Sequence, residues 1–161
     1  MAIEWEGYLR LDGQPLDGAT DADIEELEAF LDTELPEDLK KLVKKHQGQT
    51  PSNLSVELPE GGVRGFACLL HAIFEPPVPD EIEGYGIDWV TTVTEEELGH
   101  ENIVAFGDSS NSVYALDYGV DETNPPVVFI DADMTADNPE SKRRLASSVT
   151  EFFEKFETSP E

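Results

Sequence analysis

The sequence predicts a single α+β domain with the element order α-α-β-β-(long loop)-β-β-β-α. Apolar residues recur at helical spacing near both ends of the chain. Between these ends, short apolar runs stop at clusters of turn-forming residues, which is typical of strands. At 161 residues the chain can enclose one substantial hydrophobic core and is short for two.

The domain is expected over residues 20–157, after an N-terminal arm or short strand at 1–19. Thr20 is suited to cap the first helix, with Asp23 completing a shortened capping box. The residues that then fall on one helical face are Ile24, Leu27, Phe30 and Leu31. We therefore expect these four side chains to face the core.

A second helix is expected to follow the Leu35-Pro36 pair, because proline suits the first helical position. Its buried side is predicted to consist of Leu39, Leu42, Val43 and His46. Its four lysines (Lys40, Lys41, Lys44 and Lys45) are expected to be solvated and to complement the helix dipole. Gly48 is expected to end the helix.

A hairpin is predicted from the alternating segment 54–58, a Pro-Gly turn and the apolar segment 63–70. Residues 74–89 are rich in proline, glycine and acids, and are expected to form a long loop that Trp89 and Val90 anchor. Thr94 is expected to cap one short helical turn over 95–98.

A second hairpin lies at the centre of the prediction. Its strands are the apolar runs at 104–106 and 113–116, and its turn spans 108–112. Gly107 and Asn111 are the residues best suited to a left-handed backbone there. A further strand is predicted at 127–130. The last helix is expected to start at the cap Ser141 and to bury Leu145, Val149, Phe152, Phe153 and Phe156.

No motif in the sequence indicates an enzyme. Gly107-Asp108-Ser109 resembles an esterase nucleophile block, but all three histidines precede it, whereas that class carries its catalytic histidine near the C-terminus. The segment from Asp131 starts like a calcium loop but lacks its glycine and its closing glutamate. We expect no catalytic residues, no metal and no cofactor, and a buried core thiol at Cys68.

The formal net charge is −26, from ten Lys and Arg against 36 Asp and Glu. Such a surplus repels nucleic acid and anionic membranes, and it steers a basic protein partner. Plain solubility and adaptation to high salt are the rival explanations. Glu (22) outnumbers Asp (14) and Lys (6) outnumbers Arg (4), which is not expected of an extreme halophile. With no membrane-spanning run and no signal peptide, the protein is expected in the cytoplasm.

Three phrases, in this order, resemble the SUKH superfamily, named partly for fungal regulators of the Smi/Knr type. They are Ile24–Glu28 with Leu35–Leu42, then Ile103–Asp108 with Asn111, Tyr114 and Asp117, then Val127–Asp131 with the aromatic helix through Phe156. Where the family usually has Asn-Gly, this chain has His46-Gln47-Gly48. The resemblance covers about residues 20–156.

This resemblance implies a strongly bent antiparallel sheet flanked by helices, and a binding module that is not an enzyme. Many bacterial members are immunity proteins that neutralise a cognate toxin, often a nuclease; others are regulatory or scaffold domains. We therefore expect an immunity protein whose acidic surface occludes a basic toxin, with a regulatory scaffold as the alternative. The candidate contact residues are acids expected on loops beside the sheet: Asp80, Glu81, Glu83, Asp88, Asp108, Asp121 and Glu122.

Overall fold

The computed structural model describes residues 5–8, 10–11, 14–15, 19–51, 55–57, 63–66, 68–72, 85–109, 112–131, 133–135, 137–138 and 141–157. The centre of the fold is a five-stranded antiparallel sheet in the order β11-β10-β9-β8-β7. Its strands are β7 (Cys68–Leu69), β8 (Ile103–Ser109), β9 (Ser112–Asp117), β10 (Val127–Asp131) and β11 (Lys142–Ala146). The predicted α+β class is confirmed.

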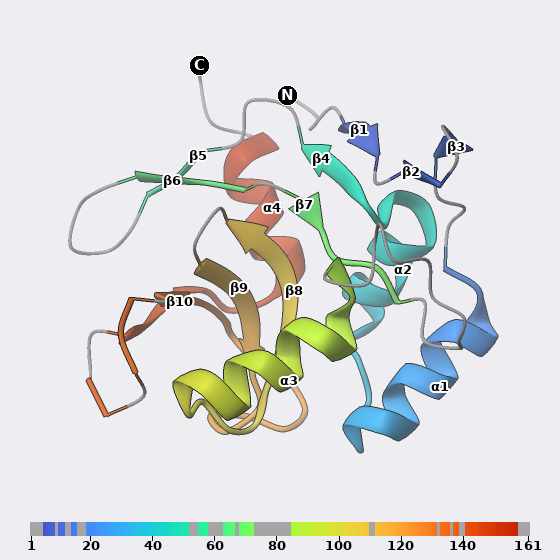
Figure 1. Cartoon of the computed structure of the whole chain (residues 1–161). Coiled ribbons are helices and arrows are strands. Elements are labelled where there is room, and N and C mark those ends of the chain that lie inside the picture. The colour runs from blue at the N-terminus through green and yellow to red at the C-terminus, as the bar shows by residue number, and fades with distance from the viewer. Residues whose placement is uncertain are drawn as a thin grey trace.

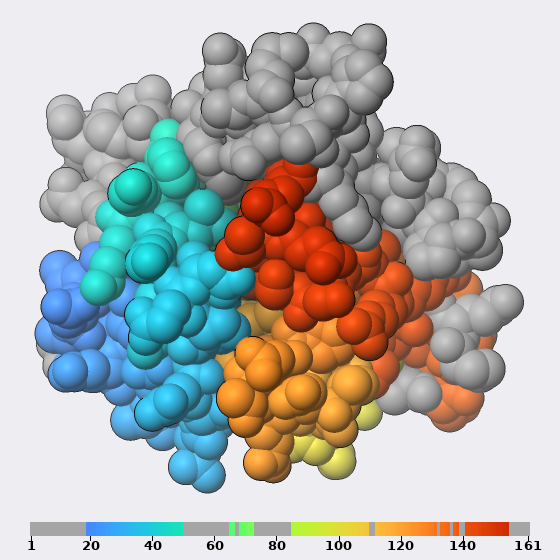
Figure 2. All heavy atoms as spheres, turned by 180° about the vertical axis from the view of Figure 1, so that it is seen from behind, coloured from blue at the N-terminus to red at the C-terminus, as the bar shows by residue number. Residues whose placement is uncertain are grey.

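Four helices cover the two faces of this sheet (Figure 1). They are α1 (Asp21–Leu31), α2 (Glu37–His46), α3 (Ile87–Leu98) and α4 (Val149–Glu157). Helix α3 lies in front of β8 in Figure 1 and α4 lies behind it, and Figure 2 shows α4 and α2 on the back of the molecule. Because both faces are covered, the inner strands are buried along nearly their whole length.

Three two-stranded sheets complete the described part of the chain. They pair β1 (Trp5–Tyr8) with β4 (Gln49–Pro51), β2 (Arg10–Leu11) with β3 (Gln14–Pro15), and β5 (Ser55–Glu57) with β6 (Val63–Gly65). The predicted hairpin at 54–70 is thus present, but its second half is divided between β6 and β7. Leu54, Leu58 and the predicted loop at 74–84 lie outside the described residues.

Aromatic rings fill the layer between the sheet and α4. Phe66 stacks on Tyr114 with ring centroids 5.0 Å apart, and Phe152 meets Phe106 edge-on at 6.1 Å. A Cβ atom on Gly107 would lie 2.5 Å from the ring of Phe66. Gly107 therefore admits a neighbouring ring inside a strand, and the prediction that it supplies a left-handed turn residue is wrong.

The start of the domain follows the sequence pattern closely. Thr20 and Asp23 form the predicted capping box, with both hydrogen bonds present. Ile24 and Leu27 are buried, as their spacing predicted. Phe30 is 51% exposed, so its prediction as a core residue is wrong. It lies beside the buried stripe of α1, where the periodicity alone does not separate core from solvent.

Helix α4 begins later than predicted. The segment expected to be its first turn is strand β11, which pairs with β10 and alternates exposed and less exposed side chains. Leu145 therefore belongs to a strand, and Ser141 is buried without capping a helix. Ser148 stands before the helix instead, and its hydroxyl accepts a hydrogen bond from the Glu151 amide. The segment is a strand because it pairs with the edge of β10, and a pattern of neighbouring residues in the sequence does not reveal that pairing.

Helix α3 replaces a predicted loop end and single turn. It runs for 12 residues, and Thr94 is not a cap, because its hydroxyl donates to the carbonyl of Val90 within the helix. Ile87, Thr91 and Thr94 form the buried side. Two of these three residues are threonines, so the sequence of the helix shows little apolar periodicity. The only helical signal was that the three buried residues are four and then three positions apart.

Candidate interaction surface

Four of the seven acids predicted to contact a partner lie among the described residues, and they occupy three separate places. They are Asp88 on α3, Asp108 on β8, and Asp121 with Glu122 on the connection between β9 and β10. Asp80, Glu81 and Glu83 lie outside the described residues. Only Asp121 and Glu122 are therefore seen on a loop beside the sheet, as predicted.

Asp108 is part of the sheet and is poorly placed for a partner. It is paired with Cys68 of β7 on one side and with Val113 of β9 on the other. It is only partly exposed, and burial raises the pKa of its carboxyl group. Burial, with a smaller contribution from the nearby Asp108 charge, raises the pKa of the Cys68 thiol to about 12. Cys68 is the buried core thiol that the sequence predicted.

Asp121 and Glu122 are exposed at the opposite end of β9 from Asp108. The Asp121 carboxylate accepts hydrogen bonds from the amides of Thr123 and Asn124, which lowers its pKa. These bonds shape its own loop. Since β9 (Ser112–Asp117) advances about 3.4 Å per residue, the two ends of the strand are roughly 17 Å apart, and the predicted acids do not form one patch.

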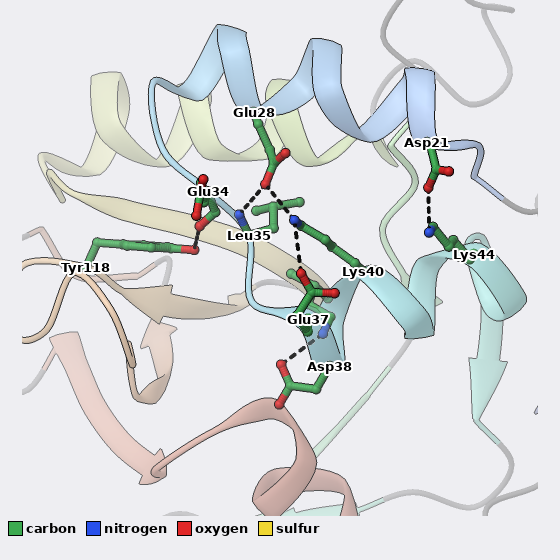
Figure 3. Close-up of polar contacts among 10 residues, drawn as sticks. Asp21, Glu28, Glu34, Leu35, Glu37, Asp38, Lys40, Lys44 and Tyr118 are labelled. Carbon is green, nitrogen blue, oxygen red and sulfur yellow. Dashed lines mark hydrogen bonds and ion pairs between the residues drawn. The ribbon is translucent and has the colours of Figure 1, made fainter.

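The lysines of α2 face the acids of α1 (Figure 3). The Nζ of Lys40 lies 3.3 Å from a Glu28 carboxylate oxygen and 3.4 Å from one of Glu37. Burial alone would lower the pKa of Lys40, but the hydrogen bonds and charges of these two glutamates raise it. Lys44 pairs with Asp21 in the same way. Lys44 is exposed, as predicted for a solvated lysine face, whereas the Lys40 side chain is only 21% exposed and departs from that prediction.

The loop between α1 and α2 is fixed by further contacts in this network. Glu28 accepts a hydrogen bond of 2.7 Å from the amide of Leu35, and the Tyr118 hydroxyl donates one of the same length to the carbonyl of Glu34 (Figure 3). In the first turn of α2, the Asp38 carboxylate accepts hydrogen bonds from both the amide and the hydroxyl of Thr150 on α4. These bonds make α1 and α2 a rigid surface layer.

A polar cluster joins Asp117 at the end of β9, Lys142 of β11 and His100, which follows α3. Asp117 is almost fully buried, forms a 2.7 Å ion pair with Lys142, and accepts a bond from the amide of Gly119. The charges of Asp117 and Lys142 both act on His100. Its Nε2 atom is buried without a hydrogen-bond partner. Burial and the positive charge of Lys142 lower the pKa of His100, against the opposing effect of Asp117. His100 and Asp117 are buried, whereas the Lys142 side chain is 38% exposed.

Helix α3 presents the most distinctive surface in the described part of the chain. Trp89 is 49% exposed on it and Tyr85, directly before it, is 39% exposed. Its acids are Asp88, Glu95, Glu96 and Glu97, and neither α3 nor α1 contains a lysine or arginine. The sequence assigned Trp89 to a loop anchor, so this exposed aromatic face was missed. In the described residues, no three His, Cys, Asp or Glu side chains are grouped to hold a metal ion.

Two comparisons with known proteins bear on the chain. A family model described as SMI1 / KNR4 family (SUKH-1) matches residues 18–155, which is most of the chain. No curated protein matches it. Within the described residues, none of the helices has the length and apolar character needed to cross a membrane.

Proposed function

Because the chain belongs to the SMI1/KNR4 (SUKH-1) family, we propose that it is an immunity protein that neutralises a basic toxin in the cytoplasm. It acts by binding and carries out no chemistry of its own. The observation that carries the proposal is the net charge of −26 on a body of this family. A toxin that acts on nucleic acid needs a cationic active-site face, and an acidic protein can cover that face.

The distribution of charge supports occlusion by surface complementarity. Helices α1 and α3 contain acids and no lysine or arginine, although Asp21 and Glu28 of α1 pair with lysines of α2, so the surface of α3 in particular is negative. Complementary potentials raise the rate of association and disfavour wrong partners, more than they raise affinity alone. The same negative field repels nucleic acid, so the protein would cover the toxin without itself binding the toxin's nucleic-acid substrate.

The chemistry of the described reactive groups supports a role in binding over one in catalysis. The Cys68 thiol is buried with its pKa raised to about 12, so it is not a nucleophile at neutral pH. The imidazole of His100 is enclosed beside an ion pair and does not reach solvent. General acid–base or covalent catalysis requires such groups to meet a substrate.

The proposal is tested by co-expression with the product of the gene directly adjacent to this one. The expected result is that this product arrests bacterial growth when expressed alone and that the acidic chain restores growth and co-purifies with it. A matched control expresses an unrelated acidic protein of similar size, which should not restore growth. If no adjacent gene encodes a growth-inhibiting protein, the proposal fails and a regulatory scaffold role within the family replaces it.

A further inference from the structure

One exposed aromatic side chain, Trp89, lies on the outer face of α3. At about 100° per residue, Trp89 points almost directly away from Ile87, which is fully buried against the core. Val93 and Glu96 follow Trp89 at the fourth and seventh positions, so this outer face extends about 10 Å along the helix. Trp89 is half exposed although it is the largest side chain on α3, so apolar surface that could be buried in a complex is left in water.

Exposed aromatic side chains concentrate at this place. Among the described residues, four large hydrophobic side chains are exposed: Phe30, Tyr85, Trp89 and Val120. Three of the four lie on α1 or at α3, and α1 packs against α3. Tryptophan and tyrosine are the residue types that most often dominate binding energy at protein interfaces. The α1–α3 face therefore combines potential anchors with a rigid support.

The charged residues of α3 and α1 are all acidic. Glu95, Glu96 and Glu97 are exposed at the end of α3, and Glu25 is exposed on α1. Two lysines of the neighbouring helix α2, Lys40 and Lys44, already pair with acids of α1. A partner that docks here gains by bringing positive charge, and arginine is suited to it, since guanidinium groups stack on indole rings and pair with carboxylates.

The opposite side of the molecule differs in charge. The described lysines and arginines outside the small N-terminal strands and β6 lie on α2, β11 and α4. Figure 2, which views the molecule from behind, shows α2 and α4 on that side, together with part of α1 and the β9–β10 connection. A cationic protein in this field is turned towards α3 and away from α2. Helix α3 thus differs from α2 and β11 in containing acids and no lysine or arginine.

We propose that the outer face of α3, with the adjoining exposed part of α1, is the docking surface for the basic protein that this chain neutralises. Trp89 is the central anchor and receives an arginine side chain of the partner, while Glu95 and Glu96 pair with cations around it. The assignment rests on the proposed function and adds the place and the chemistry of binding. A second copy of the chain is disfavoured, because it would bring acid against acid.

Fluorescence of Trp89 gives a direct test with a defined probe. The chain has two tryptophans, so Trp5→Phe leaves Trp89 as the single reporter. The probe is a ten-residue arginine peptide, with a glycine–serine peptide of equal length as its control. At about 50 mM salt, where exposed charges are weakly screened, we expect the arginine peptide to shift and quench the emission of Trp89. The control peptide should leave it unchanged.

Two charge-reversed variants with the same net charge separate this surface from the general field. One is Glu95→Lys with Glu96→Lys on α3, and the other is Glu122→Lys with Glu154→Lys, at exposed positions on the β9–β10 connection and α4. We expect peptide affinity to fall about tenfold in the first and less than about threefold in the second. Lysine suits the last turn of α3, so the first variant should fold. Equal losses in the two variants overturn the proposal.

A second test measures binding to the partner protein itself. With the adjacent-gene product, Trp89→Ala should weaken binding by about 30-fold or more, as hot-spot truncations do. Val120→Ala, which truncates another exposed hydrophobic residue, should change it less than about threefold. If the wild-type chain fails to restore growth, the proposed function fails. If it restores growth and Trp89→Ala binds as tightly as wild type, the function stands and the docking surface is wrong.

Discussion

At the scale of single residues, the least expected group is His100. Nothing in the sequence indicated that the three histidines converge, and the structure places His100 beside the ion pair of the buried Asp117 and the partly exposed Lys142. Its Nε2 atom has no hydrogen-bond partner, although buried polar atoms are normally satisfied. Protonating this ring would add a charge next to Lys142. The site is therefore stable with a neutral imidazole.

His100 is expected to make the fold weaker in mild acid. Its pKa is lowered in the folded state, so between the unfolded pKa of about 6.5 and the lower folded value the unfolded chain binds the extra proton. Stability is then fully present above about pH 6.5 and falls as the pH drops through this window. His100→Leu should flatten that fall. Urea unfolding at about pH 7.5 and 5.5 measures it, and an equal loss in both proteins would contradict the assignment.

At the scale of elements, α4 is held from both of its sides. At its N-terminus, the amide and hydroxyl of Thr150 donate hydrogen bonds to the Asp38 carboxylate of α2. Along its length, two phenylalanines pack into the aromatic layer on the sheet. The helix spans only nine residues and is too short to be stable alone. Its stability therefore comes from these tertiary contacts.

Asp38→Ala should destabilise the fold by about 1 kcal/mol, the usual cost of losing a helix N-terminal cap. Two hydrogen bonds to Thr150 and the favourable charge at the helix N-terminus are lost together. Glu37→Ala is the matched control, since its side chain is 80% exposed. Chemical denaturation should find little change in the control, and equal effects at the two positions would show that the contact to α4 is unimportant.

Phe152→Ala should be far more costly, at about 3–5 kcal/mol, as is typical for a buried phenylalanine. Phe152 is 1% exposed and its ring contacts those of Phe106 and Tyr114. Trp89→Ala removes a larger but exposed ring, and we expect it to change stability by no more than about 0.5 kcal/mol. Thermal and urea unfolding compare the two, and similar losses would contradict the assigned core.

Local sequence patterns predicted the elements whose signals are local. The capping box of Thr20 and Asp23, the buried pair Ile24 and Leu27, and the central hairpin were all readable from spacing and turn residues. Helix α3 was not, because its buried side is largely threonine. Strand β11 was not, because its identity depends on the neighbouring edge of β10.

Of the candidate site, the sequence predicted only that its charge is negative. The excess of acids indicated a basic partner, and the sequence placed the contacts at seven separate acids. Asp108 proved to be a strand residue with restricted exposure, while Asp121 is engaged by its own loop. The exposure of Trp89 depends on which side of α3 faces the sheet. That orientation cannot be read from a helix that the sequence did not reveal.

At the scale of the whole molecule, the charge of −26 has to be compatible with a stable fold. Mutual repulsion among exposed acids opposes compaction, and salt screens it. In the described part of the chain, Lys40, Lys44 and Lys142 each relieve some of this repulsion by pairing with acids of other elements. The core beneath them contains many fully buried large apolar residues, which carry no charge for salt to screen.

The fold is therefore expected to be complete at low salt. Raising sodium chloride from about 0.1 to 2 M should increase the melting temperature by only several degrees, as weak surface repulsion is screened. Differential scanning calorimetry measures this dependence. A chain that unfolds below molar salt would contradict the expectation and would favour salt adaptation as the reason for the acidity.

The central claim, that the acidic surface binds a cationic protein, is tested most directly by calorimetric titration with the adjacent-gene product. The titration is run at about 50 and 300 mM sodium chloride, on either side of physiological screening. We predict saturable binding at both concentrations, with the dissociation constant weakened about tenfold or more at the higher one. Absence of binding at both concentrations, or an affinity that does not respond to salt, would contradict the claim.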